Sequence, residues 1–451
     1  MTTPEEIIDQ GLEHHRAGRY GQAQALYQQA LQLDVEHPDA WHLLGIILRD
    51  TGQLDDAVHC LSEAIRLRAD VSSFHVNLAE ALRRQGRLDL ALAAAERAVA
   101  VSPAFSDAHA TLAAVFQSLR RFDDALAEYD RAVELNPTRV DPHYNRAWIW
   151  LSRGDYARGF PEYEWRWQRP DFERSRFSGP RWDGSALAGR TLAVECEQGL
   201  GDTIQFIRYV LILREFGERA IVVSQPQVVQ LLRDSGISDV FAMGAPLPEY
   251  HVHVGLLSLP GLLRTTLSCV PAQVPYLSAR ADLVEQWRNK LAEFQGFKIG
   301  IHWQGNPNSP HEPGRSMPLA HFEHLAHDGV SLISLQKGFG VEQIPAANKR
   351  FRVIEFGAEL DERSGPFTDT AALMQNLDLV VTSDTVTAHL AGALGVPVWV
   401  ALGFDCDWRW MHSREDSPWY PTMRLFRQAQ PGQWSDVFAR IGAELGRLPK
   451  G

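Results

Sequence analysis

Small residues recur along the first third of the chain with a step of 34 positions. Each period is predicted to form two helices, with a glycine at the turn between them in most periods. Small side chains at fixed places let the paired helices approach closely, and each pair then stacks on the next. The alanines that carry the period are Ala23, Ala57, Ala91 and Ala125, followed seven positions later by Ala30, Ala64, Ala98 and Ala132.

This period resembles the tetratricopeptide repeat, a helix pair of 34 residues. Four repeats are clear, and a fifth begins near Asp141 and deviates after Tyr156. We therefore expect a tetratricopeptide α-solenoid over residues 1–168, in which the aromatic segment 159–167 forms a capping helix. The glycines that mark the turns are Gly18, Gly52, Gly86 and Gly154.

A stacked array of this kind presents a concave groove. We expect the groove to dock a protein or peptide partner, and the alternative is a spacer that only stabilises the following domain. His75, His109 and His143 share one repeat position, with Trp41 at the equivalent place. Their separation by whole repeats argues against a metal site and favours packing between helices.

The pattern changes at Arg190 from helix pairs to short apolar runs that alternate with helices. This order predicts two Rossmann-like α/β domains over residues 190–281 and 282–451, after a surface linker over 169–189. The predicted strands cover 192–194, 220–224, 239–241, 250–254, 298–303, 331–335, 352–356, 377–381 and 396–402. The predicted helices cover 203–216, 228–232, 282–294, 318–326, 370–376 and the alanine-rich stretch after Asp384.

Composition narrows the class of protein. A chain of 451 residues has room for two or three domains, and its net charge of −12 argues against nucleic-acid or anionic-membrane binding. The four cysteines form no CxxC pair, which favours a reducing compartment. The acidic N-terminus does not have the pattern of a signal peptide, and no segment approaches the roughly 18 apolar residues of a membrane helix. We therefore expect a cytoplasmic protein without membrane insertion.

The segment 383–399 carries the strongest sign of ligand chemistry. Asp384, Thr385 and Thr387 lie at a predicted helix start that directly follows a buried strand. Helix starts bind phosphates through their unpaired N–H groups and positive dipole end. The carboxyl end of a parallel strand is also where ligands bind in an open α/β sheet. The sequence therefore predicts a nucleotide diphosphate at this helix start.

Several other chemistries are poorly supported. The turn from Gly199 to Asp202 lacks the third glycine of a dinucleotide fingerprint, and the chain contains no GxxxxGK[ST] or GxSxG motif. His251 and His253 alternate along a predicted strand and allow a metal site. With no third ligand nearby, we favour exposed or hydrogen-bonded histidines.

Five motifs in fixed order resemble those of GT-B glycosyltransferases. The likeness is to the heptosyltransferase-like group (glycosyltransferase family 9-like), and specifically to its bacterial tetratricopeptide-linked members. It extends over nearly the whole chain. The motifs that carry it cover residues 199–202, 302–307, 315–319, 334–338 and 384–389.

The resemblance implies an inverting, metal-independent enzyme that moves a sugar from a nucleotide-sugar donor to an acceptor. No cofactor is implied besides this co-substrate. Asp202 matches the catalytic base that takes the proton of the acceptor hydroxyl. Gln198, Gly199 and Gly201 form the acceptor-side loop around it. The alternative role for Asp202 is to cap a helix that begins at Thr203.

On the donor side, Asp384, Thr385 and His389 match an Asp-Thr-Gly-x-x-His motif, which implies contacts with the donor diphosphate. The alternative for His389 is a histidine satisfied within the core. Val386 stands where the motif has glycine, so either the valine shifts the donor slightly or the phosphate contact moves to Thr387.

The remaining predicted donor contacts come from three loops. Arg315 lies near the place of a lysine that this chain lacks, and it either stabilises the leaving diphosphate or is a surface arginine. Gln336 ends a strand at a place that commonly contacts a base or ribose. Trp303, Gly305 and Asn306 form a loop that we expect to be mobile.

A second interpretation of the whole chain is a repeat scaffold whose transferase half is degenerate and only binds a ligand.

Overall fold

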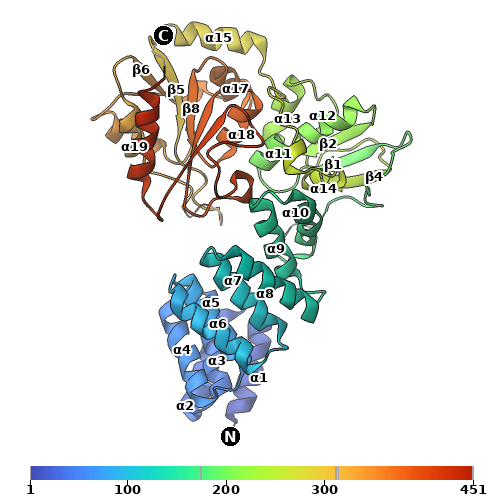
Figure 1. The fold of residues 1–451 in the computed structure, drawn as a ribbon, viewed down its shortest axis with the longest axis vertical. Helices are drawn as coiled ribbons and strands as arrows, with labels where there is room; N and C mark the ends of the chain where they lie inside the picture. The colour runs from blue at the N-terminus through green and yellow to red at the C-terminus, as the bar shows by residue number, and fades with distance from the viewer. Residues whose placement is uncertain (1, 173–174, 310–311, 313, 449–451) are drawn as a thin grey trace. The chain divides into compact units, whose positions relative to one another are not determined.

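The computed structural model describes residues 2–172, 175–309, 312 and 314–448 (Figure 1). The chain divides into two compact units, which we describe separately. The first comprises Met1–Ile149 and Glu162–Phe172, and the second comprises Trp150–Pro161 and Glu173–Gly451. Across the described ranges, we find no helix that is both long and apolar enough to cross a bilayer.

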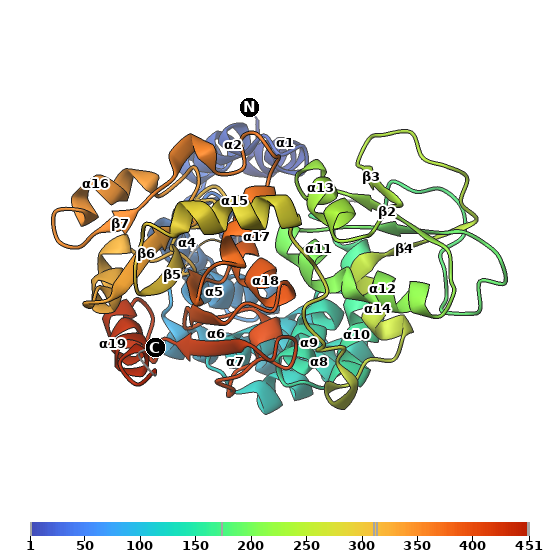
Figure 2. The same ribbon diagram turned by 90° about the horizontal axis from the view of Figure 1, so that it is seen from above.

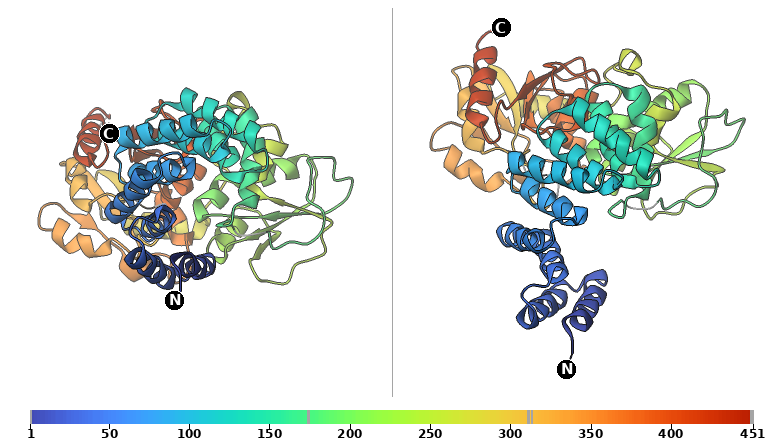
Figure 3. Two further views of the ribbon diagram at one scale, coloured as in Figure 1. Left: turned by 90° about the horizontal axis from the view of Figure 1, so that it is seen from below. Right: turned by 60° about the horizontal axis from the view of Figure 1, so that its bottom comes forward.

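The first unit is an array of helix pairs, as the period predicts (Figure 3). Consecutive helices pack on each other as hairpins, and each hairpin packs on the next. The helices are α1 (Pro4–Arg16), α2 (Tyr20–Leu33), α3 (Pro38–Asp50), α4 (Leu54–Leu67), α5 (Ser72–Arg84), α6 (Leu88–Val101), α7 (Ser106–Ser118), α8 (Phe122–Leu135) and α9 (Val140–Ser152).

The periodic small residues explain this packing. Ala23, Ala57, Ala91 and Ala125 are fully buried between neighbouring helices. A Cβ atom on Gly45 would stand 2.7 Å from the Leu61 side chain, so only glycine fits there without a shift. The array is therefore held together by close approach of backbones at fixed repeat positions.

The turn inside each hairpin requires a left-handed backbone. Gly18, Gly52 and Gly86 adopt φ values of 70°, 83° and 75° at this turn. Arg120 occupies the same position in the fourth repeat and adopts a φ of 60°. Left-handed backbone is strained for an L-residue with a side chain, so the fourth turn is less favourable than the others.

The shared histidine position is a packing position, as predicted. The Nε2 atoms of His75, His109 and His143 lie 2.9, 3.0 and 3.0 Å from the carbonyl oxygen six residues earlier. Trp41 donates its indole N–H to the equivalent carbonyl at 2.7 Å. Each ring thus fixes the connection that enters its own helix hairpin.

The predicted cap is formed by α10 (Tyr156–Tyr163) and a 3-10 helix, η1 (Glu164–Gln168). Within the first unit, Trp165 stacks on His143 with ring centroids 3.8 Å apart. Tyr163 stacks on Tyr144 of the same repeat at 5.6 Å. These rings cover the end of the last helix pair.

The second unit contains two fully parallel sheets, which Figure 2 shows from above. Strand order is β3-β2-β1-β4 in the first sheet and β10-β9-β8-β5-β6-β7 in the second. The first sheet consists of β1 (Leu192–Glu195), β2 (Ala220–Ser224), β3 (Val240–Ala242) and β4 (Val252–Gly255). The second consists of β5 (Phe297–His302), β6 (Val330–Ser334), β7 (Val353–Ile354), β8 (Leu379–Ser383), β9 (Val398–Leu402) and β10 (Met423–Arg427).

Helices connect and cover these strands, which confirms a parallel-sheet α/β region. One face of the six-stranded sheet packs its buried side chains against η4 and α19 in a single apolar core. The connecting helices are α11 (Leu200–Phe206), α12 (Arg208–Glu215), α13 (Pro226–Asp234), α14 (Leu259–Leu262), α15 (Ala281–Leu291), α16 (Ile344–Ala347), α17 (Thr368–Met374), α18 (Val386–Ala393) and α19 (Trp434–Leu445). The short 3-10 turns include η2 (Leu256–Ser258), η4 (Leu319–Leu325) and η7 (Trp408–Trp410).

The single helix predicted over 203–216 is wrong, because the chain forms α11 and α12 with a break at Ile207. Arg208 donates its Nε–H to the Gln205 carbonyl at 2.7 Å, and Tyr276 donates its hydroxyl to the Ile204 carbonyl at 3.0 Å. Side chains therefore take carbonyls that a continuous helix would use. The helix predicted over 318–326 is also wrong in type, because this segment is the 3-10 helix η4.

The predicted surface linker lies partly inside the second unit. Arg181 pairs with His253 at the edge of the four-stranded sheet, and the Trp182 N–H donates to the His253 carbonyl at 2.8 Å. Trp182 and Leu187 are buried. The expectation of a wholly exposed linker is therefore wrong at these residues, where apolar side chains extend the core.

Candidate functional site

The two motifs predicted to carry chemistry meet in the second unit. The turn after β1 leads into α11, the turn after β8 leads into α18, and the two helices pack against each other (Figure 1). Both turns leave the carboxyl end of a parallel strand. The segments 198–202 and 384–389, which follow strands of separate sheets, are therefore brought together.

Asp202 lies at the third position of α11, and its carboxylate is fully engaged. Oδ2 accepts the Gly199 N–H at 2.8 Å, and Oδ1 accepts from Arg409 Nη2 at 2.5 Å. The alternative that Asp202 is an N-cap before Thr203 is wrong, because Gly199 is the cap and α11 begins at Leu200. Asp202 instead secures the start of α11 from inside its first turn.

Arg409 is the site residue that sequence reasoning missed. Its side chain is 6% exposed and binds both Asp202 and Asp407, with Nη1 2.8 Å from the Asp407 carboxylate. The guanidinium lies 4.4 Å from the Trp408 ring centroid and 5.4 Å from that of Phe206. An arginine enclosed between two tryptophans after an aspartate was the available signal, but nothing local indicated Asp202 as its partner.

His389 is buried at the contact between α11 and α18. Its Nδ1 lies 3.0 Å from the Tyr420 hydroxyl, and its ring stacks on Trp410 with centroids 5.1 Å apart. Burial, helped by nearby arginine charges, holds the pKa of His389 well below its ordinary value of 6.5. The imidazole is therefore neutral at pH 7.

Gly201 packs tightly against the donor motif. A Cβ atom at this position would stand 2.8 Å from His389 Cδ2. In the same loop, Gln198 adopts a φ of 68°, and its carbonyl accepts from Gln225 Nε2 at 3.0 Å. Gln225, which the sequence did not single out, also accepts from the Thr203 hydroxyl at 2.8 Å and so fixes the turn before α11.

Asp384 is buried beside a second arginine. Its Oδ1 lies 3.3 Å from Arg315 Nη2, and the same guanidinium donates to the Asp384 carbonyl oxygen. Burial raises the pKa of Asp384, and the Arg315 charge opposes that rise. Arg315 is 33% exposed and ion-paired, so it is not an isolated surface arginine.

Two further predicted donor contacts, Thr385 and Thr387, lie at the start of α18. Thr385 is its N-cap and makes no side-chain capping bond. The Thr385 hydroxyl lies 3.3 Å from His302 Nδ1. Thr387 is buried within the first turn.

Gln336 and Trp303 support the loop after β5 from inside the protein. The Gln336 carboxamide oxygen accepts the N–H groups of Trp303 and Gln304, both at 3.0 Å. Its NH2 group donates to the carbonyls of Gln304 and Phe339, both at 2.7 Å. Trp303 is fully buried and donates its indole N–H to the Gly340 carbonyl at 3.2 Å. Both side chains therefore make structural contacts in this state, and a ligand contact by either would require them to be broken.

The rest of this loop is more open. The Gly305 N–H donates to the Ser316 hydroxyl at 2.9 Å, and a Cβ atom on Gly305 would stand 2.4 Å from the Glu312 carboxylate. Asn306 is exposed, and its side chain accepts the Asn308 N–H at 3.0 Å. The predicted donor loop is thus fixed at Trp303 and reaches the surface at Asn306.

The two strand histidines have hydrogen-bonded and packed roles. His251 Nδ1 accepts the Thr191 N–H at 3.0 Å, and His253 is buried and stacks on Phe177 at 5.6 Å. A search of the described residues finds no group of three or more His, Cys, Asp or Glu side chains arranged to hold a metal ion.

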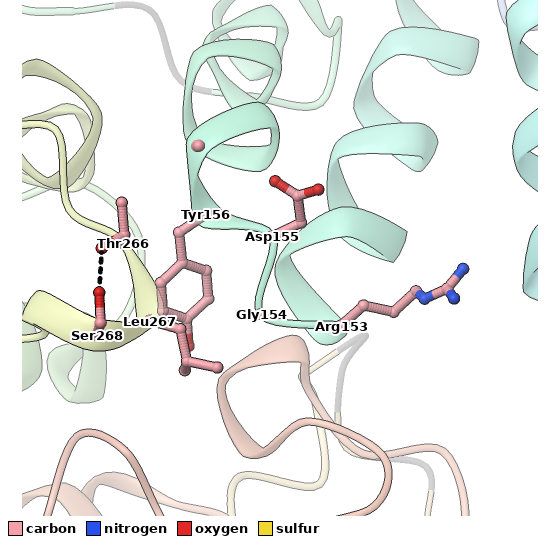
Figure 4. Close-up of a pocket in the computed structure, with 8 residues that line it drawn as sticks. Arg153, Gly154, Asp155, Tyr156, Thr266, Leu267 and Ser268 are labelled. Atoms are coloured by element: carbon pink, nitrogen blue, oxygen red, sulfur yellow. Dashed lines mark hydrogen bonds between the residues drawn. The ribbon is translucent and has the colours of Figure 1, made fainter.

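An open depression of about 660 Å³ lies elsewhere in the second unit (Figure 4). It contains none of the predicted site residues. The Thr266 and Ser268 hydroxyls at its rim lie 3.0 Å apart. Its lining residues are Arg153, Gly154, Asp155, Tyr156, Ala157, Thr266, Leu267 and Ser268.

Family models described as tetratricopeptide repeat match residues 8–58, 42–109 and 82–149. The N-terminal region is a tetratricopeptide-repeat array. These matches end at residue 149, before the α/β region begins. The amino-acid sequence alone therefore identifies residues 8–149 as tetratricopeptide repeats.

One curated protein is similar to this chain beyond the repeat region. The chain is 28% identical to "Protein FlbA" of Caulobacter vibrioides over 322 residues, which cover 66% of this chain and 53% of that protein. The chain therefore spans about half the length of this curated relative.

Solved structures that are similar include MamA, with 20% identity and a TM-score of 0.31 over 34% of this chain and 91% of that one. A thermophilic tetratricopeptide protein of Thermus thermophilus gives 21% identity and a TM-score of 0.34 over 37% and 92%. YrrB, titled a tetratricopeptide protein with an unusual peptide-binding site, gives 19% and 0.30 over 37% and 86%.

Proposed function

We propose that the second unit is an inverting, metal-independent glycosyltransferase of the GT-B type, acting on a nucleotide-sugar donor. The observation that carries the proposal is the packing of α11, which contains Asp202, against α18, which contains His389, with Gly201 directly against the His389 ring. These residues come from distant motifs and lie at the carboxyl ends of strands in two different parallel sheets. Ligands commonly bind at such strand ends.

The chemistry of these residues suits sugar transfer. Asp202 would take the proton of the acceptor hydroxyl as the sugar–phosphate bond breaks. Arg315 and Arg409 would offset the negative charge that develops on the leaving diphosphate. When Tyr420 donates its hydroxyl hydrogen to His389 Nδ1, Nε2 carries the imidazole proton and can donate it to a phosphate oxygen.

The repeat array supports a protein or peptide as the acceptor. Such arrays bind partners along an extended concave surface. In this proposal the array docks the acceptor chain and the second unit modifies it. Residues 1–168 would then determine which protein is modified, while the donor-side residues would determine which sugar is transferred.

A second candidate function is a scaffold whose α/β half binds a ligand without turnover. One observation favours it: both oxygens of the Asp202 carboxylate are engaged, by Gly199 and by Arg409. The sequence also favours a scaffold, because Val386 stands where the motif has glycine. The Asp202 carboxylate would have to release one of these bonds before it could face an acceptor hydroxyl.

Transfer assays with Asp202→Asn separate the two candidates. The full chain is incubated with labelled nucleotide sugars and a lysate or purified acceptors, and transfer is followed by label incorporation. The transferase proposal expects incorporation by the wild type and a loss of about a hundredfold or more in Asp202→Asn, with nucleotide binding retained. Nucleotide binding without incorporation in either protein favours the scaffold. Asp416→Asn, which removes an exposed partner of Arg414, is the matched control.

A further inference from the structure

Arg409 is a buried cation, and its carboxylate partners Asp407 and Asp202, both in the described part of the chain, differ in origin. Asp407 lies on the same turn, and it accepts from both the Arg409 side chain and the Arg409 backbone N–H, at 2.8 and 2.9 Å. Asp202 comes from α11, which follows strand β1 of the four-stranded sheet. The bond to Asp407 is therefore local, whereas the bond to Asp202 joins two separately folded strand–helix segments.

The two ends of the Asp202–Arg409 pair differ in access to solvent. The Asp202 side chain is 18% exposed, whereas the Arg409 side chain is 6% exposed and is covered by the Trp408 and Phe206 rings. The solvent-exposed part of this ion pair is therefore mainly on Asp202. Any ligand that contacts Arg409 from there takes the place that the carboxylate occupies.

A buried guanidinium needs an anionic partner. Asp407 would stay bound to Arg409 if Asp202 moved away, but the Nη2 group that Asp202 binds would then lose its acceptor inside the protein, which costs free energy. Exchanging one anion for another avoids that cost, because Nη2 keeps an anionic acceptor. A diphosphate suits this exchange, since arginine binds phosphate oxygens with two parallel N–H donors.

The surroundings contain a second arginine that would share the same anion. Arg315 pairs with Asp384 at the start of α18. The charges of Arg409 and Arg315 both act on His389, the residue of the donor motif that packs against Gly201. An anion seated beside His389 would therefore be within the influence of both guanidinium groups.

We propose that Arg409 is an anion-binding residue of this site, and that a diphosphate replaces Asp202 as its partner. The Asp202–Arg409 ion pair then closes the ligand-free site, and its exchange frees the Asp202 carboxylate to act as a base. This inference rests on the proposed transferase function, which supplies the diphosphate. It also explains how a carboxylate that is engaged in the ligand-free protein becomes available after the donor binds.

Titration calorimetry of the full chain tests the exchange, with inorganic pyrophosphate as the first probe. Asp202→Asn removes the competing charge with little change of shape, so it should bind pyrophosphate about tenfold more tightly than the wild type. Arg409→Gln should bind it at least about tenfold more weakly, and Arg409→Lys should fall between. Asp416→Asn should match the wild type. UDP, GDP, ADP and CMP titrations then show how much affinity the nucleoside adds.

Opposite results overturn the proposal. It fails if Asp202→Asn binds pyrophosphate no more tightly than the wild type, or if no protein in the series binds it. It fails also if a folded Arg409→Gln binds as well as the wild type. Should Arg409→Gln not fold, as judged by circular dichroism, the sign of the Asp202→Asn effect still decides. If Asp202→Asn binds pyrophosphate more tightly but the wild type transfers no sugar, the exchange at Arg409 stands and the transferase function is rejected. If the wild type transfers sugar but Asp202→Asn binds pyrophosphate no more tightly, the transferase function stands and the exchange is rejected.

Discussion

Gly201 lies directly against His389, so that a Cβ atom on Gly201 would stand 2.8 Å from the imidazole Cδ2. The two residues belong to α11 and α18, which follow strands of different sheets. The helix starts that carry the predicted base and the predicted donor motif thus meet through a position with no room for a side chain. This contact defines the geometry on which the proposed function depends.

Gly201→Ala should therefore disturb both stability and ligand binding. Real Cβ atoms do not approach a ring carbon this closely, so α11 or His389 must shift. We expect a loss of about 1–3 kcal/mol in the free energy of unfolding and weaker nucleotide binding. Urea unfolding and calorimetry measure the two effects. Gly21→Ala, where a Cβ meets nothing within 4 Å, should cost nothing. A Gly201→Ala protein indistinguishable from the wild type would contradict this account.

Tyr420→Phe should weaken anion binding without unfolding the protein. The Tyr420 hydroxyl is 3.0 Å from His389 Nδ1, and when it donates to this nitrogen the imidazole proton is on Nε2. Losing this bond should reduce affinity for pyrophosphate or a nucleoside diphosphate by about fivefold, because one hydrogen bond contributes about 1 kcal/mol. Thermal unfolding provides the folding control. Unchanged affinity in a folded Tyr420→Phe protein would show that His389 orientation does not matter for binding.

Stability should fall as the pH falls from about 6.5 towards 4. Burial lowers the pKa of His302 to about 4, against 6.5 in the unfolded chain. In this window the unfolded chain binds a proton that the native protein does not, so acid favours unfolding. The contribution of His302 is fully present above pH 6.5, and roughly 3 kcal/mol of it is lost by pH 4.

Comparison with His302→Asn isolates this effect. Both proteins contain the other titrating groups, including His389 and Asp384, so the difference between their pH profiles reports His302. Urea unfolding at pH 7, 6, 5 and 4 should show a shallower decline for His302→Asn. Parallel profiles for the two proteins would mean that His302 is protonated as readily in the native state as in the unfolded chain.

Arg120→Gly should stabilise the repeat array. Arg120 adopts a φ of 60° at a turn where three other repeats of the array have glycine. Relief of left-handed strain should exceed the entropy that glycine adds to the unfolded chain and the loss of the cation–π contact with Phe122, for a net gain of about 1 kcal/mol. Urea unfolding followed by helical circular dichroism measures it.

The matched control is Gly86→Ala at the equivalent turn, which should destabilise the array by about 1 kcal/mol. If Arg120→Gly were neutral or destabilising while Gly86→Ala behaved as expected, contacts of the Arg120 side chain would outweigh the backbone strain.

The array and the parallel sheets could be predicted because their signals are local. Alanines spaced by one repeat specify the helix pairs, and continuous apolar runs such as 398–402 specify strands buried on both faces. The break at Ile207 could not be predicted, because it depends on Tyr276 from a distant loop. Helical periodicity alone gives no sign that a carbonyl is taken by another side chain.

The site was predictable only in part. Asp202, Asp384 and His389 stand in recognisable motifs, and the structure brings them together. Arg409 was missed because its partner Asp202 lies 207 positions away in the chain. Gln336 was assigned to a ligand because it ends a strand, although its carboxamide is used by neighbouring backbone groups. Sequence position identifies the edge of a sheet but not which side chains remain open to solvent.

Calorimetric titration of the full chain with UDP-, GDP-, ADP- and CMP-linked sugars measures whether the second unit binds a nucleotide-sugar donor. We expect saturable binding of one nucleotide class with one ligand per chain, and weaker binding in Arg409→Gln. We also expect a matching rise in melting temperature, because a ligand that binds only the native state stabilises it. Absence of binding for all four classes at millimolar concentration would contradict the proposed donor site and the transferase function that depends on it.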